Sequence, residues 1–150
     1  MQKNYKEYLK LNRSLILSII SAISLSAVTA QLFADQESHV NSSYTVTVDM
    51  ITFYSVFSTL FYFDNRKKYR LESGKLDSPR LKKDLIKIVS SLGVGELVYI
   101  VARWSLQYYF LTINYEAYLA SIAAHIVSVA LYLIVVNVGV RITRLYKDGS

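Results

Sequence analysis

Four long apolar runs, separated by strongly polar stretches, limit what this chain can fold into. The runs cover residues 14–34, 46–63, 86–112 and 118–140. A helix needs about 20 apolar residues to cross the hydrocarbon layer of a bilayer, and each run is close to that length. None of the runs strictly alternates polar and apolar residues, so helices are favoured over a membrane barrel. The sequence predicts one all-α domain over residues 1–150, with four transmembrane helices in two antiparallel pairs.

The basic residues predict the orientation of these spans. Sixteen of the 17 lysines and arginines lie in the first 13 residues, in the connection 64–87 or after residue 140, and the other two connections carry none. Positively charged flanks stay on the cytoplasmic side, so both termini are predicted to be cytoplasmic. An N-glycosylation sequon at Asn41 lies on the predicted outer side. We expect a multi-pass protein of the cell membrane that contacts lipids and does not bind nucleic acid.

The first run permits a second interpretation. Its basic start, apolar stretch and small residues before Gln31 resemble a signal peptide that is cleaved after Ala30, which would leave three spans. We expect an uncleaved first helix.

The residue types exclude several kinds of active site. The chain has no cysteine and two histidines, so thiolate chemistry is excluded and a histidine-rich metal centre is not expected. No phosphate-binding glycine loop or nucleophile elbow is present. Asp35, Glu37 and His39 alternate in the first outer loop and could form a weak cation site, although a solvated loop is the simpler interpretation. We expect a non-catalytic protein without a cofactor or a resident metal.

Polar residues interrupt the third run where hydrocarbon is expected. Glu96, Tyr99, Arg103 and Gln107 share one helical face, and His125 of the fourth run reaches a similar depth. Arg103 is expected to lean back toward Glu96, with Tyr99 or water bridging the two charges. A charge at the bilayer centre costs about 2.5–3.5 kcal/mol on insertion scales, so these side chains should face the bundle interior or a partner subunit. They could fix helix register, bind a ligand or contact a partner.

Small residues at every fourth position predict the packing faces of two helices. Side chains of this size let helix backbones approach closely, which is how helices associate in lipid. The same stripes could also form a face for dimerisation or for a partner subunit. They are Ser18, Ala22, Ser26 and Ala30 in the first run and Ala120, Ala124 and Ser128 in the fourth.

The connection between the second and third runs combines a basic cluster with a helix start. The cluster could hold an anionic lipid headgroup or a pyrophosphate, or it could be an ordinary positive flank. Ser78 and Pro79 are typical of the first positions of a helix, and an amphipathic segment toward the third run should follow. The cluster consists of Arg66, Lys67, Lys68 and Arg70.

The order of these features resembles the GtrA-like family of small four-helix membrane proteins. In that family the second helix ends in a pattern of aromatic, Asn-Arg and aromatic residues, and FYFDNRKKY at 61–69 is similar to it. VVNVGVRITRLY at 135–146 is a weaker counterpart at the end of the fourth run. The resemblance implies a role in moving or presenting polyprenyl-phosphate-linked sugars for cell-surface polysaccharide. The basic cluster would then face the lipid phosphate.

A structural role is the competing interpretation. Small tyrosine-rich helical proteins with short loops are typical accessory subunits of larger membrane enzymes, for example an archaeal membrane-bound monooxygenase such as ammonia monooxygenase. A polar cavity around Glu96, Arg103 and His125 would favour the sugar-lipid role. Burial of these residues against another chain would favour the accessory subunit.

Overall fold

The structure is a computed structural model that describes residues 2–91 and 93–142, and this part of the chain forms five α-helices. Two long hairpins are joined by a connection that contains one short helix. The prediction of an all-α fold is confirmed. The helices are α1 (Gln2–Leu32), α2 (Ser38–Asn65), α3 (Ser78–Ser91), α4 (Gly93–Thr112) and α5 (Ala117–Ile142).

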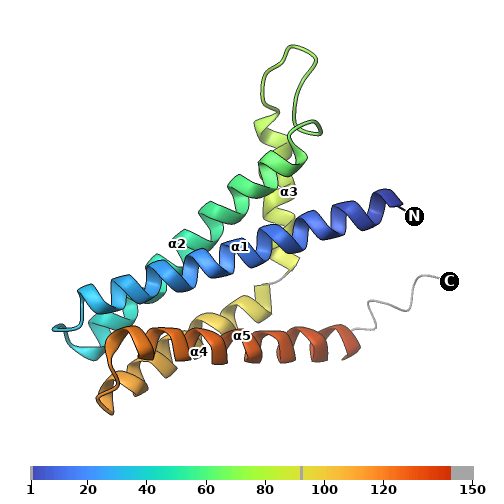
Figure 1. The fold of residues 1–150 in the computed structure, drawn as a ribbon. Helices are drawn as coiled ribbons and strands as arrows, with labels where there is room; N and C mark the ends of the chain where they lie inside the picture. Colours follow the sequence, from blue (N-terminus) through green and yellow to red (C-terminus); the bar gives the residue numbers. More distant parts are fainter. Residues whose placement is uncertain (1, 92, 143–150) are drawn as a thin grey trace.

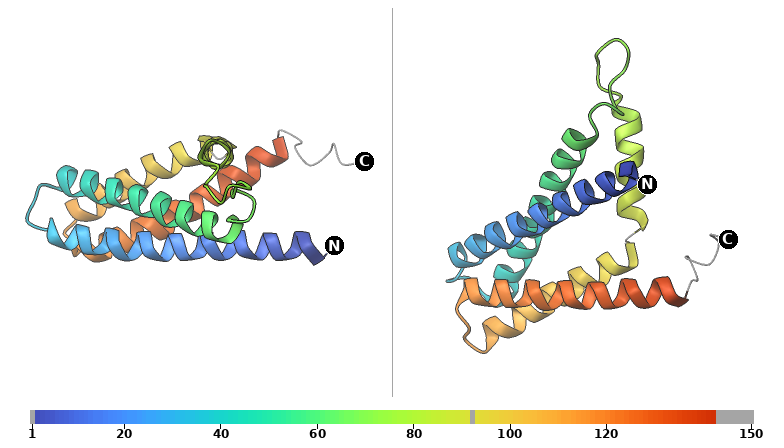
Figure 2. Two further views of the ribbon diagram at one scale, coloured as in Figure 1. Left: turned by 90° about the horizontal axis from the view of Figure 1, so that it is seen from above. Right: turned by 45° about the vertical axis from the view of Figure 1, so that its right-hand side comes forward.

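The two hairpins pack against each other around a shared interior. α1 lies along α2 and α4 lies along α5, while α1 also contacts α5 and α2 also contacts α4. The short loops 33–37 and 113–116 lie together at one end of the molecule (Figure 1). From that end the hairpins diverge, so the start of α1, the end of α5 and the connection 66–77 lie at the other end (Figures 1 and 2).

The space between the long helices is rich in polar side chains, and the outer faces of these helices are rich in exposed apolar side chains. The buried side chains include serines, threonines, asparagine, glutamine, aspartate, arginine and histidine, and the buried apolar residues are mostly alanines. Large apolar side chains point outward instead, with Val94 74% and Leu97 66% exposed. A water-soluble bundle buries its leucines and isoleucines, so this distribution suits a hydrocarbon surrounding.

Three helices in the described part of the chain are long and apolar enough to cross a membrane. These segments are Asn12–Leu32, Ser38–Asn65 and Ala117–Val135. α4 is not among these segments, and its 20 residues include the charged Glu96 and Arg103. Its 20 residues nevertheless extend over about 30 Å at 1.5 Å per residue, the thickness of the hydrocarbon core.

The predicted third run, residues 86–112, is two helices rather than one. The helix start predicted at Ser78 is confirmed, but that helix ends at Ser91 and α4 begins at Gly93 in another direction (Figure 1). Gly93 and Gly95 are poor helix formers, which weakens this stretch as a place for one helix to continue. Residues 86–91 therefore belong to the amphipathic helix α3.

Candidate functional site: a buried polar network

A network of polar side chains lies between the four long helices, in the half of the molecule that carries the short loops. Asp49 comes from α2, Tyr99 and Arg103 from α4, and His125 from α5. Arg103 is 0% exposed and Asp49 is 1% exposed. The interior thus holds one fixed cation and one carboxylate that no solvent reaches.

Asp49 connects α2 to α4 and α5. The Tyr99 hydroxyl donates a hydrogen bond to Asp49 Oδ2. His125 Nδ1 lies 3.1 Å from Asp49 Oδ1 and 3.2 Å from the Tyr99 hydroxyl. Arg103 Nε lies 3.9 Å from Asp49 Oδ2, close enough for strong attraction in a dry interior. Asp49 is therefore the point where three helices meet.

Arg103 extends the network to the remaining helix. Its Nη1 donates to Oε1 of Gln107, one turn further along α4. Its Nη2 donates to Ser121 Oγ of α5 at 2.8 Å and lies 3.5 Å from Ser26 Oγ of α1. Together with Asp49 of α2, the guanidinium contacts all four long helices. A planar group with five donors suits such a central position better than a lysine ammonium.

Asn41 forms a second junction nearer the short loops. Its side-chain Nδ2 donates to the carbonyl oxygens of Ala30 at 2.8 Å and Phe33 at 2.9 Å, where α1 ends. Its Oδ1 accepts from Gln107 Nε2 at 2.9 Å and from Thr45 Oγ1 at 3.2 Å. Asn41 thus satisfies carbonyls that the end of a helix leaves unpaired and also joins the two hairpins.

The position of Asn41 bears on the sequon at residues 41–43. A glycan attaches to the side-chain nitrogen of asparagine at the protein surface. Asn41 is buried, and this nitrogen already makes two hydrogen bonds. In this fold the asparagine is a structural residue and its nitrogen is closed to a glycan.

Arg103 was expected to lean toward Glu96, with Tyr99 or water bridging the two charges. This expectation is wrong in the choice of carboxylate, because Tyr99 and Arg103 both contact Asp49 instead. Glu96 is half-buried near the Tyr54 hydroxyl of α2. The structure does bring Tyr99, Arg103, Gln107 and His125 together. Sequence reasoning missed Asp49, although an aspartate inside the apolar run 46–63 was a usable signal.

The predicted small-residue stripes all lie inside the molecule. Ser26 of α1 and Ser121 of α5 approach each other to 3.5 Å between their hydroxyl oxygens, so the two hairpins come close at this level. Side chains larger than serine or alanine would hold the backbones apart. The buried stripe residues are Ser18, Ala22, Ser26, Ala30, Ala120, Ala124 and Ser128.

The residues of the basic cluster differ in their surroundings. Arg66, Lys67 and Arg70 are exposed. Lys68 Nζ instead lies 2.6 Å from Asp84 Oδ2 of α3, and the buried Tyr69 donates to the same oxygen at 2.7 Å. Lys68, with help from the Tyr69 hydroxyl, holds the pKa of the Asp84 carboxyl below its usual range. Lys68 thus joins the connection to α3 through this ion pair.

The FYFDNRKKY stretch mainly closes the open end of the first hairpin. Asp64 pairs with Arg13 of α1 and accepts from Ser14 Oγ at 3.1 Å. Asn65 Nδ2 donates to the carbonyl of Phe61 within α2. These contacts explain the acidic and amide positions of the stretch without a ligand.

Among the described residues, the loop between α1 and α2 does not bring together a set of metal ligands. Glu37 and His39 lie 3.3 Å apart between Oε2 and Nδ1, and both are exposed. Nowhere in residues 2–91 and 93–142 do three acidic or histidine side chains gather as metal ligands would. Asp35 and Glu37 are thus surface residues of the loop between α1 and α2, and His39 is an exposed residue in the first turn of α2.

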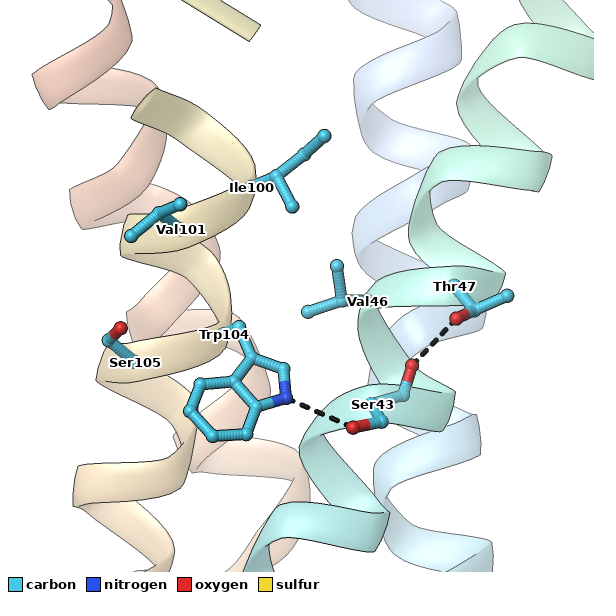
Figure 3. A pocket seen from close by; sticks show the side chains of 7 residues that line it. All are labelled: Ser43, Val46, Thr47, Ile100, Val101, Trp104 and Ser105. Atoms are coloured by element: carbon cyan, nitrogen blue, oxygen red, sulfur yellow. Dashed lines mark hydrogen bonds between the residues drawn. The ribbon is translucent and has the colours of Figure 1, made fainter. Parts of the chain in front are cut away.

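A groove of about 560 Å³ lies on the outside of the bundle, between α2 and α4 (Figure 3). The Trp104 indole nitrogen donates to Ser43 Oγ at 3.0 Å and joins its two walls. The side chains that line the groove are uncharged, and none of them belongs to the buried network, so the groove is separate from it. The lining residues are Ser43, Val46, Thr47, Ile100, Val101, Trp104 and Ser105.

Comparison with known proteins finds no relative: no protein-family model matches the chain, and no curated protein or solved structure matches it.

Proposed function

We propose that this chain is an integral protein of the cell membrane that crosses the bilayer four times, with both termini in the cytoplasm. The apolar exterior around a polar interior is the observation that carries this proposal. Besides the three apolar helices, α4 also spans the membrane in this proposal, because Arg103 and Gln107 point inward while Val94 and Leu97 point outward. Its contact with Asp49 holds α4 at the same depth as α2.

The topology predicts how single cysteines will react, and the natural chain contains none. Glu37→Cys and Glu116→Cys should react with a membrane-impermeant maleimide in intact cells, since both loops lie outside. Ser73→Cys should react only after the cells are permeabilised. All three positions are exposed, so differences in labelling do not result from burial of the thiol within the protein. Reaction of Ser73→Cys in intact cells, or protection of Glu116→Cys there, would contradict the four-span topology.

The function that we propose is to move or present polyprenyl-phosphate-linked sugars, without catalysis. The exposed cations at the cytoplasmic end of α2 support it, because Arg66 and Arg70 can each grip a phosphate with two donors. Arg103 and His125 are buried between the helices, so the open polar cavity that would favour this role does not surround them, and they do not meet the lipid. The phosphate would bind the basic cluster while the prenyl chain lies along the apolar exterior.

Binding of a long-chain polyprenyl phosphate tests this function. The triple variant Arg66→Gln, Lys67→Gln, Arg70→Gln should weaken binding at least tenfold, since a hydrogen bond to a charged group contributes about 1.5–3 kcal/mol. Native mass spectrometry of protein in an uncharged detergent measures the bound fraction.

The matched control for this test removes the same charge from the next part of the connection. Lys75→Gln, Lys82→Gln and Lys83→Gln together should leave binding within about twofold, because a site on the cluster depends on direct contacts. An equal loss in both triple variants would indicate general charge attraction and contradict a site at the cluster.

An accessory subunit is the second candidate function, and the groove between α2 and α4 favours it. Ser43, Thr47 and Ser105 are small, so a partner helix can approach closely there. The buried charges themselves need no partner chain, because the four helices surround them. Purification in mild detergent distinguishes the two: stoichiometric large partners would support the subunit, and a lone monomer or homodimer would support the carrier.

A further inference from the structure

The connection between the hairpins, together with α3, forms a strongly basic unit that we name the cytoplasmic arm, residues 66–86. It contains eight basic and three acidic residues, a net charge of +5. Lys68 and Asp84 neutralise each other. The four cations beyond the cluster are also exposed. They are Lys75, Arg80, Lys82 and Lys83.

The arm also exposes large apolar side chains. Leu71 is 48% exposed, Leu76 is 45% exposed and Ile86 is 54% exposed. Exposed leucine and isoleucine beside lysine are typical of segments that lie in the headgroup region, where the apolar groups enter the acyl boundary and the cations meet phosphate.

Backbone contacts give the arm a defined shape. Leu71 N donates to Lys75 O at 2.9 Å, and Asp77 N donates to Tyr69 O at 2.8 Å. Gly74 has φ +78°, a left-handed conformation that glycine adopts without strain and that closes this turn. The Tyr69–Asp84 hydrogen bond then fixes the turn against α3. The charges and the apolar side chains are therefore presented on an ordered unit.

The arm is oriented across the bundle. α3 runs transverse to the long helices in Figure 1 and is seen end-on in the left view of Figure 2, where α1 and α5 lie lengthwise. It belongs to the end of the molecule that carries the start of α1. If the long helices cross the membrane, α3 lies along the membrane surface.

We propose that the cytoplasmic arm docks on the anionic phospholipid surface of the membrane that holds the protein. Leu71, Leu76 and Ile86 enter the acyl boundary, and the exposed lysines contact the headgroup phosphates. The positive charge of the arm favours anionic lipid as its binding partner. The transverse orientation of α3 favours the flat surface of the membrane as the place where it binds. The inference rests on the proposed four-span topology and is independent of the sugar-lipid function.

A fluorophore on the turn of the arm tests this docking in the full-length protein. Ser73→Cys, labelled with an environment-sensitive dye, is placed in nanodiscs of phosphatidylcholine alone or with phosphatidylglycerol, and no polyprenyl lipid is present. We expect blue-shifted emission and quenching by doxyl-labelled lipid only in the anionic discs. Each lysine neutralised among Lys75, Lys82 and Lys83 should weaken docking about fivefold, as expected for a cation near an anionic surface.

Two further variants separate the contributions. Leu71→Ser with Leu76→Ser should abolish the blue shift while the charge is kept, and Glu72→Gln, which removes an acid, should strengthen docking. Identical emission in neutral and anionic discs would overturn the proposal. Release of the arm by inorganic pyrophosphate at constant ionic strength would also overturn it, because the ligand would then be a soluble phosphate.

Discussion

We expect Asp49→Asn to destabilise the protein more than any other single substitution in the described bundle. It leaves the guanidinium of Arg103 in a dry interior without an anion. Removing one partner of a buried ion pair costs about 3–5 kcal/mol. Thermal unfolding of the detergent-purified variant, followed by circular dichroism, should show a large fall in the midpoint, and size-exclusion chromatography should show aggregation.

The double variant Asp49→Asn, Arg103→Gln decides whether the ion pair is the cause. It removes both charges, so it should recover most of the stability that either single variant loses. Glu96→Gln is the matched control, because it neutralises a half-buried carboxylate on α4 that lies near Tyr54 rather than near Arg103. The explanation fails if Asp49→Asn is as stable as Glu96→Gln, or if the double variant is as unstable as the two losses combined.

The second largest effect is expected for Asn41→Ala. The substitution removes both hydrogen bonds to the end of α1 and leaves the Gln107 amide without its acceptor. Each buried polar group left unsatisfied costs about 1–3 kcal/mol, so the first hairpin should loosen and its contact with α4 should weaken. Hydrogen exchange of the amides in residues 26–33 should rise together with the loss of thermal stability.

Ser43→Ala is the control for Asn41→Ala. Both substitutions destroy the sequon, but Ser43 is exposed, and its hydroxyl accepts from the Trp104 indole and donates to the His39 carbonyl within α2. We expect a small change in stability for Ser43→Ala. Equal losses for the two variants would mean that glycosylation, rather than the hydrogen bonds of Asn41, is what the protein requires.

Local spacing was enough to find much of the buried face. Arg103 and Gln107 interrupt an apolar run. Because exposing such side chains to lipid costs free energy, they are expected to face the interior of the bundle. The stripes of serine and alanine could be found in the same way, because a period of four along a helix marks one face. These features depend on one helix at a time.

The contacts between helices could not be predicted in this way. Two carboxylates, Glu96 and Asp49, were available to Arg103, and Glu96 is nearer along the sequence. The choice depends on the rotation and depth of α2 relative to α4, which spacing within one helix does not set. The junction at Asn41 is hidden for the same reason, since its partners at Ala30 and Gln107 belong to different helices. The break between α3 and α4 likewise depends on what α3 packs against, such as its contacts with Lys68 and Tyr69 of the connection.

The placement of the two interior charges has a consequence for biogenesis. Asp49 belongs to the hairpin that the ribosome makes first, and Arg103 emerges only about fifty residues later, in the second hairpin. During that interval the carboxyl group of Asp49 lacks Arg103, so in an apolar surrounding it has to be protonated or hydrated. A chain that stops at this stage has in α2 a carboxyl group whose partners Tyr99, Arg103 and His125 have not yet been made.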